Sequence, residues 1–252
     1  MSHFPVLVFT NGEATYEELL ERYDENMEVE KYISYTKEEA IEEGKRRVEN
    51  IREFLRKNPG KEMPHFNDDD YKTDEDYYQF VESDYPEEFK DEEGNLYSTY
   101  NRDAKWDWYV EGGRFSGTLK NKAGEYVTSA PLSEIKISRD ESAYEKALRF
   151  WGVAVEGKPM EKGENFFSLY KPEYYIDRYK CKEVYAYIVS HPIFRACVTP
   201  DGVWHEKGQM GWWACSSETG EESLRWDLNF IDDYLLTGIE NNWYVTVVDC
   251  HI

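Results

Sequence analysis

The stretch TGEESLRWDLNFIDDYLLTGIENNWYVTVV, residues 219–248, decides the fold class that the sequence predicts. Thr219 and Glu222 form a capping-box pattern, and leucine and isoleucine then recur at helical spacing as far as Gly238. A run rich in β-branched residues follows at 243–248 and predicts a strand. A helix that leads directly into a strand indicates a fold that combines both types of element.

The rest of the chain adds elements of both kinds. Apolar runs predict strands at 4–10, 32–35, 183–190 and 192–199, and the turn residues 200–202 after the last run predict a hairpin or meander. Capping-box patterns at Thr15 and Thr36 predict two helices, and the longer one ends at 58–60. We therefore expect an α+β fold with an antiparallel or mixed sheet, covering helices and room for ferredoxin-like elements.

Composition excludes several classes of protein. The 252 residues include 52 acidic and 30 basic residues, with a formal net charge of -22, and 16% are aromatic. The aromatic content is too high for a disordered chain, and the negative charge argues against direct binding to nucleic acid or to anionic membranes. No apolar run approaches the roughly 18 residues of a membrane helix, and the first residues do not form a signal peptide. These features predict a cytoplasmic protein with reduced cysteines.

The most acidic segment spans residues 68–93, where 13 acidic and two basic residues give a net charge of -11. It also carries tyrosine and phenylalanine, so we expect part of it to pack. One interpretation is a solvated insert that keeps the protein soluble, and the other is a surface that presents carboxylates in place of phosphates to a basic partner. The residues assigned to that partner surface are Asp68, Asp69, Asp70, Asp74, Glu75 and Asp76.

Composition changes near residue 100, because all eight tryptophans lie beyond it. This change predicts a strand–helix unit at 1–60, an acidic, tyrosine-rich insert or linker at 61–100, and a tryptophan-rich α+β domain at 101–252. A single domain that includes all three parts is the alternative.

The segment NRDAKWDWYVEGGRFSG, residues 101–117, has the densest set of distinctive residues. Its alternating pattern predicts a β-hairpin that reverses at Gly112-Gly113. One interpretation is a ligand site, in which Arg114 meets an anionic group and a tryptophan supplies a stacking surface. The other is a core hairpin in which Arg114 pairs with Asp107 or Glu111. The ligand-binding residues of the first interpretation are Trp106, Trp108, Gly112, Gly113, Arg114 and Trp212.

Histidines provide the candidates for catalysis. Asp249 and His251 lie two residues apart, directly after the strand predicted at 243–248, and their side chains share one face if that strand continues. An imidazole oriented by a carboxylate is suited to general acid–base chemistry, and His205, Asp249 and His251 are therefore the catalytic candidates. The alternative is a structural histidine at the end of the chain. The spacings of histidine, cysteine and acidic residues match no metal motif, so we expect neither a metal nor a cofactor.

Several motifs together resemble an uncharacterised protein family found in bacteriophages, prophages and some bacteria. The matching segments are KWDWY at 105–109, GGR at 112–114, PDGVWH at 200–205, MGW at 210–212 and VVDCH at 247–251. The resemblance implies a cytosolic protein of phage or mobile-element type, a setting in which acidic accessory proteins that blunt host defences are common. It implies no catalytic residue.

Two functions follow as expectations. The first is a non-enzymatic accessory protein that binds and inhibits or sequesters a basic host partner, such as a nucleic-acid-handling defence factor that mistakes its acidic surface for DNA. The alternative is an enzyme or binding module for a nucleotide-like anionic ligand, built from the tryptophan, arginine and histidine cluster. The acidic segment and the family context favour the first.

Overall fold

The computed structural model describes residues 3–209 and 217–252, and the chain divides into two compact units. Residues 1–25 and 103–252 form the larger unit, and residues 26–102 form the smaller unit. The α+β fold expected from the sequence is confirmed. The unit boundaries differ from those expected, because the first 25 residues belong with the C-terminal part of the chain rather than with residues 26–60. None of the described helices is long and apolar enough to cross a membrane.

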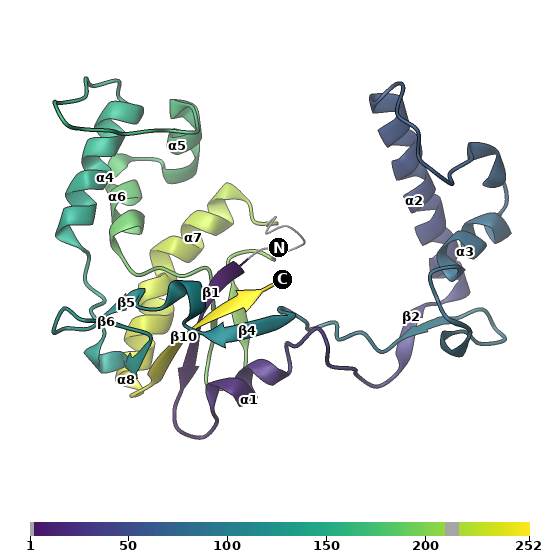
Figure 1. Ribbon diagram of the computed structural model, residues 1–252, viewed down its shortest axis with the longest axis horizontal. Coiled ribbons are helices and arrows are strands. Elements are labelled where there is room, and N and C mark those ends of the chain that lie inside the picture. Colours follow the sequence, from purple (N-terminus) through teal and green to yellow (C-terminus); the bar gives the residue numbers. More distant parts are fainter. Residues whose placement is uncertain (1–2, 210–216) are drawn as a thin grey trace. The chain divides into compact units, whose positions relative to one another are not determined.

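A mixed sheet is the centre of the larger unit. In the described part of the chain its strands follow the order β4-β10-β1-β8-β9, and β7 also pairs with β10. Strand β1 pairs antiparallel with β10 and parallel with β8, so it lies in the middle of the sheet beside the last strand of the chain (Figure 1). The strands are β1 (His3–Thr10), β4 (Trp108–Glu111), β7 (Ser129–Pro131), β8 (Ala196–Val198), β9 (Trp204–Glu206) and β10 (Tyr244–His251).

Each face of this sheet carries its own apolar core. Alternate residues of β1 point to opposite faces, so Leu7 and Phe9 pack in one core and Val6 and Val8 in the other. Helix α7 (Gly220–Phe230) and the helical turns after it cover the first face, which we call the α7 face. Helix α1 (Tyr16–Glu21) covers the second face, together with Trp106.

Three helices begin where the sequence predicts. Capping boxes at Thr15, Thr36 and Thr219 are all confirmed. Each threonine hydroxyl accepts a hydrogen bond from the N–H three residues later, and the glutamate at that position accepts one from the threonine N–H. Helix α7 continues through a π-helical segment, Ile231–Leu236, into α8 (Thr237–Glu240), so the helical pattern extends slightly past Gly238. The hairpin predicted around 200–202 is also confirmed, since β8 pairs antiparallel with β9.

The strand predicted at 183–190 is wrong. These residues belong to helix α6 (Lys182–Ser190), which packs against α4 (Glu141–Ala154) and buries Ala186. A short apolar run does not distinguish a strand from a buried helix, and packing against a neighbouring helix decides between them. Helix α5 (Pro172–Tyr179) completes this helical group, and an aromatic cluster around Tyr175 joins α5 to the other two helices.

The hairpin predicted at Gly112-Gly113 is also wrong. Strand β4 ends at Glu111, and the chain then makes a 3-10 turn over Gly113–Phe115 instead of returning along β4. The partner of β4 is β10, with Trp108 opposite His251 and Val110 opposite Asp249. A short hairpin, β5 (Leu119–Lys120) with β6 (Tyr126–Val127), forms further along the chain.

The smaller unit is a helical pair with a two-stranded sheet. Helix α2 (Lys37–Lys57) packs against α3 (Asp74–Glu82), and β2 (Tyr32–Tyr35) pairs with β3 (Leu96–Ser98). Its core includes Ala40, Tyr78, Val81 and Leu96. Ion pairs on the surface of α2 join Glu43 to Arg46 and Arg47 at 2.6 and 2.7 Å.

These ion pairs predict that the smaller unit is sensitive to acid. Hydrogen bonds from Arg46 and Arg47 lower the pKa of Glu43 to about 2, and only 13% of its side chain is exposed. A carboxylate with a depressed pKa stabilises the fold above its unfolded pKa, near 4.5, and this contribution disappears as the pH falls toward 2. We expect Glu43→Gln to remove about 1–3 kcal/mol at pH 7 and much less at pH 2. Urea unfolding at the two pH values measures this difference, and equal losses would contradict it.

Candidate functional site

Two histidines from opposite ends of the chain lie together on the α7 face of the sheet. His3 of β1 is directly opposite His251 of β10, and their ring centroids are 5.0 Å apart. His3 Nδ1 lies 2.9 Å from Asp249 Oδ1, and His251 Nδ1 lies 2.6 Å from Asp107 Oδ1. Each imidazole therefore has a carboxylate of its own, and we call these four residues the paired-histidine site.

The carboxylates determine which nitrogen of each ring is available. An ionised carboxylate only accepts hydrogen bonds, so Nδ1 of His3 and of His251 carries the donated proton. Nε2 of each neutral ring is then the basic atom. A carboxylate on Nδ1 also fixes the orientation of the ring, an arrangement that is used in general acid–base catalysis. The site thus holds two imidazoles side by side, each with Nδ1 bound to a carboxylate, and 11% of the His3 side chain and 5% of the His251 side chain are exposed.

The register of the strands builds this arrangement. Pairing of β4 with β10 puts Trp108 beside His251, and the two rings stack at 4.9 Å with an interplanar angle of 17°. The turn after β4 places the N–H of Arg114 2.9 Å from Asp249 Oδ2, while Asp249 Oδ1 binds His3. Asp249 is 1% exposed, and these two bonds supply partners for its buried oxygens.

The solvent side of the site is formed by Trp108 and Arg114. Trp108 is 44% exposed, although one of its faces covers His251. Arg114 is exposed, and no carboxylate among the described residues forms an ion pair with its guanidinium. The expected pairing of Arg114 with Asp107 or Glu111 is thus not found there. An indole and a guanidinium suit a ligand that combines an aromatic group with a negative charge.

Some of the residues predicted from sequence meet at this site. Trp108, Gly113, Arg114, Asp249 and His251 lie together, as the ligand and catalytic interpretations require. Gly112 is in the same turn and donates its N–H to Val247 O, so its contact is with the sheet.

Other predicted residues lie elsewhere. Trp106 is buried in the core beneath α1, on the opposite face of the sheet. His205 lies on the edge strand β9, where Nε2 is 3.1 Å from Thr199 Oγ1. Trp212, together with the rest of the MGW segment, falls outside the described residues.

Sequence reasoning missed His3 and Asp107 as members of the site. His3 belongs to a strand predicted to start at Phe4, and its partner Asp249 lies 246 residues away. From the sequence, Asp107 is indicated only as a possible ion-pair partner of Arg114. One signal was available, because Asp107, Trp108, Asp249 and His251 all lie within the segments that carry the family resemblance.

The described residues contain no group of three or more histidine, cysteine or acidic side chains placed to hold a metal ion. Burial raises the pKa of both the Cys197 and the Cys250 thiols, so neither has the thiolate character of a nucleophile or metal ligand.

The acidic residues assigned to a partner surface have local partners within the smaller unit. Asp68 pairs with Arg52 at 2.6 Å, Asp74 with Lys45 at 2.9 Å, Glu75 with Lys37 at 3.5 Å and Asp69 with Lys72 at 3.2 Å. Asp70 accepts from Asn67, and Asp76 caps the first turn of α3. Much of the charge is thus balanced by bases close by, and binding of a basic partner stays a prediction.

Comparisons with protein-family models, curated proteins and solved structures find no match to this chain. The resemblance to a phage-associated family stays a prediction. Function is therefore argued from the geometry of the site.

Proposed function

We propose that the larger unit is an enzyme in which His3 and His251 perform general acid–base catalysis on a small anionic ester that carries an aromatic group. One observation carries this proposal. Two imidazoles lie 5.0 Å apart, and each has Nδ1 occupied by a different carboxylate. The alternative, a structural histidine at the end of the chain, accounts for His251 alone and does not account for a second histidine–carboxylate pair beside it.

The reaction class is hydrolysis or group transfer. Nε2 of one neutral histidine removes a proton from an attacking water or hydroxyl, and the other histidine, as an imidazolium, gives a proton to the leaving group. One proton is taken up and one is released, so solvent exchange restores the starting protonation states. Asp249 and Asp107 stabilise the imidazolium that each histidine becomes during the cycle.

The exposed residues orient the substrate. The guanidinium of Arg114 neutralises the negative group, while the accessible surface of Trp108 receives the aromatic part. Phosphate esters with an aromatic leaving group combine these features, and so do nucleotides. The site thus fits the nucleotide-like ligand that the sequence suggests as an alternative to a basic partner.

The test uses p-nitrophenyl phosphate and bis(p-nitrophenyl) phosphate as probes with the full chain. We expect turnover by the wild type, and a loss of about 100- to 10,000-fold in kcat for His3→Asn and for His251→Asn. Asparagine can still donate to the carboxylate from the position of Nδ1, but it offers no titratable nitrogen. Arg114→Gln is expected to raise KM about tenfold.

The matched control is His65→Asn, because His65 is exposed and lies in the smaller unit. This variant is expected to keep full activity. Failure of the wild type to turn over either probe, or unchanged kcat in both site variants, would contradict the proposal.

A further inference from the structure

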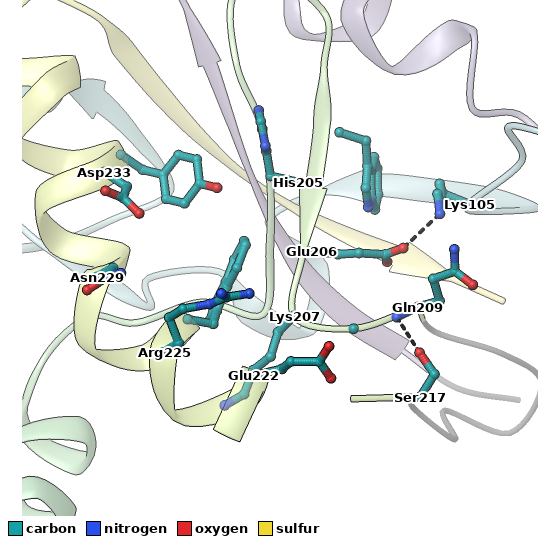
Figure 2. A pocket seen from close by; sticks show the side chains of 14 residues that line it. Lys105, His205, Glu206, Lys207, Gln209, Ser217, Glu222, Arg225, Asn229 and Asp233 are labelled. Atoms are coloured by element: carbon teal, nitrogen blue, oxygen red, sulfur yellow. Dashed lines mark hydrogen bonds and ion pairs between the residues drawn. The ribbon is translucent and has the colours of Figure 1, made fainter. Parts of the chain in front are cut away.

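A second polar site lies beside the edge strand β9. A groove of about 700 Å³ opens between β9 and the helical segment that begins with α7, and it belongs entirely to the larger unit (Figure 2). The paired histidines do not line it. Its size is typical of sites that enclose a small organic molecule.

Some of the charged side chains that line the groove form ion pairs and others do not. Lys105 binds Glu206 at 2.7 Å, and Lys207 binds Asp227 at 2.6 Å.

Among the described residues, Glu222, Arg225 and Asp233 line the groove without an ion-pair partner. Glu222 accepts hydrogen bonds from the N–H and the hydroxyl of Thr219, and these bonds and the nearby charge of Arg225 lower its pKa. The groove therefore offers one cation and two carboxylates to a ligand, and only Asp233 lies away from Arg225.

Arg225 and Asp233 are too far apart for a compact ligand to reach both. They lie eight residues apart on one continuous helical segment, which corresponds to a rise of about 12 Å. Figure 2 shows Asn229 between them on the same helical segment, with His205 of β9 across the groove. A free amino acid carries both charges on one carbon and cannot bridge them, so an elongated ligand is required.

Aromatic rings line the space between the two charges. Trp226 and Tyr234 lie 5.4 Å apart, and Tyr234 lies 5.2 Å from the ring of His205. Trp226 is held rigidly, because its indole N–H donates to Phe194 O at 2.8 Å. Such a wall suits a flat heterocycle.

The tautomer of His205 adds an acceptor. The Thr199 hydroxyl donates to Asp201 Oδ1 at 2.5 Å, so it accepts from His205 Nε2–H. Nδ1 of the neutral ring is then free of its proton, and burial keeps the pKa of His205 below its usual range. His205 Nδ1 and the Asp233 carboxylate are therefore both hydrogen-bond acceptors, and a ligand at this part of the groove needs donors to bind them.

We propose that this groove binds a purine nucleoside monophosphate, with the base against the aromatic rings beside Asp233 and the phosphate at Arg225. The two adjacent N–H donors of guanine match the two oxygens of one carboxylate, so guanosine monophosphate is the preferred ligand. The guanidinium of Arg225 is suited to two phosphate oxygens. This binding site is separate from the paired-histidine site and does not depend on the activity proposed for it.

Isothermal titration calorimetry of the full chain with guanosine and adenosine monophosphate tests the proposal. We expect the guanine nucleotide to bind more tightly, Arg225→Gln to weaken both about 10- to 100-fold, and Asp233→Asn to weaken mainly the guanine nucleotide. Lys122→Gln and Asp232→Asn are matched charge controls on exposed positions outside the groove. Both are expected to bind as the wild type does.

Turnover of the two nitrophenyl probes by Arg225→Gln and Asp233→Asn separates the two proposals, because neither residue belongs to the paired-histidine site and both variants are expected to keep the activity proposed for it. Thermal unfolding of each variant confirms that the fold is retained. The proposal is overturned if neither nucleotide releases heat at millimolar concentration, or if folded Arg225→Gln and Asp233→Asn bind both nucleotides as tightly as the wild type.

Discussion

Replacement of Asp227 by asparagine is expected to destabilise the larger unit by about 3–5 kcal/mol, because it removes the carboxylate that both hydrogen-bonds to and neutralises the buried Lys207 ammonium. The two side chains are 5% and 11% exposed, and both carboxylate oxygens accept from Lys207 Nζ. Burial already raises the pKa of Asp227 and lowers that of Lys207, since both charged forms lose solvent. A loss of this size corresponds to a fall of about 10 °C in melting temperature.

The pH dependence of the variant distinguishes this cause from general damage. A lysine whose folded pKa is depressed costs stability below its unfolded pKa, near 10.5, and the cost disappears as the pH rises toward that value. The deficit of Asp227→Asn relative to wild type is therefore expected to shrink between pH 7 and pH 10. A deficit that stays constant over this range would show that the buried charge is not its source.

A double substitution provides the matched control. Lys207→Met with Asp227→Leu removes both charges and keeps similar volumes, so we expect it to recover most of the lost stability. Asp232→Asn, at an exposed position of the same helical segment, is expected to change the free energy of unfolding by less than about 0.5 kcal/mol.

The second large effect is expected at Gly113, where alanine should cost about 2–5 kcal/mol and distort the paired-histidine site. Gly113 has φ of +49°, a conformation that costs a residue with a side chain roughly 1–2 kcal/mol. A Cβ there would also lie 2.5 Å from Asp249 Oδ2 and 2.7 Å from Val110 Cγ1. Asp249 would have to move, and with it the bonds to His3 and to the N–H of Arg114.

Gly124→Ala is the control for the backbone conformation alone. Gly124 has φ of +91°, but an added Cβ would meet nothing closer than 4.0 Å. We expect this variant to lose only the conformational part, about 1–2 kcal/mol. Nitrogen-15 spectra of the histidine side chains should show a changed environment of His3 in Gly113→Ala and none in Gly124→Ala. Identical spectra and equal unfolding free energies in the two variants would contradict the steric argument.

Features of this fold that depend on residues close together along the chain could be predicted from the sequence, and features that depend on distant contacts could not. The helix caps at Thr15, Thr36 and Thr219 were predictable because each depends on residues three positions apart. The run at 183–190 was not, since its apolar residues fit a strand or a buried helix, and α4 supplies the contact that selects the helix.

The candidate site shows the same division. The shared face of Asp249 and His251 follows from the two-residue period of a strand, and the sequence shows it directly. The hydrogen-bond partners of Asp249 and His251 could not be predicted from the sequence. They are His3 and Asp107, which come close only because β10 pairs with both β1 and β4. The prediction of a hairpin at Gly112-Gly113 was wrong for the same reason, because β4 pairs with β10, the last strand of the chain, and not with the residues that directly follow it.

The sequence by itself determined where α1, α2 and α7 begin, the turn between β8 and β9, the mixed α+β class and the negative charge, because local spacing and composition set these properties. Tertiary structure alone decided that two histidine–carboxylate pairs lie side by side and that Arg225 and Asp233 face one groove with His205. These contacts join strands and helices that are remote along the chain. Their geometry depends on the order and register of the whole sheet, which no single segment specifies.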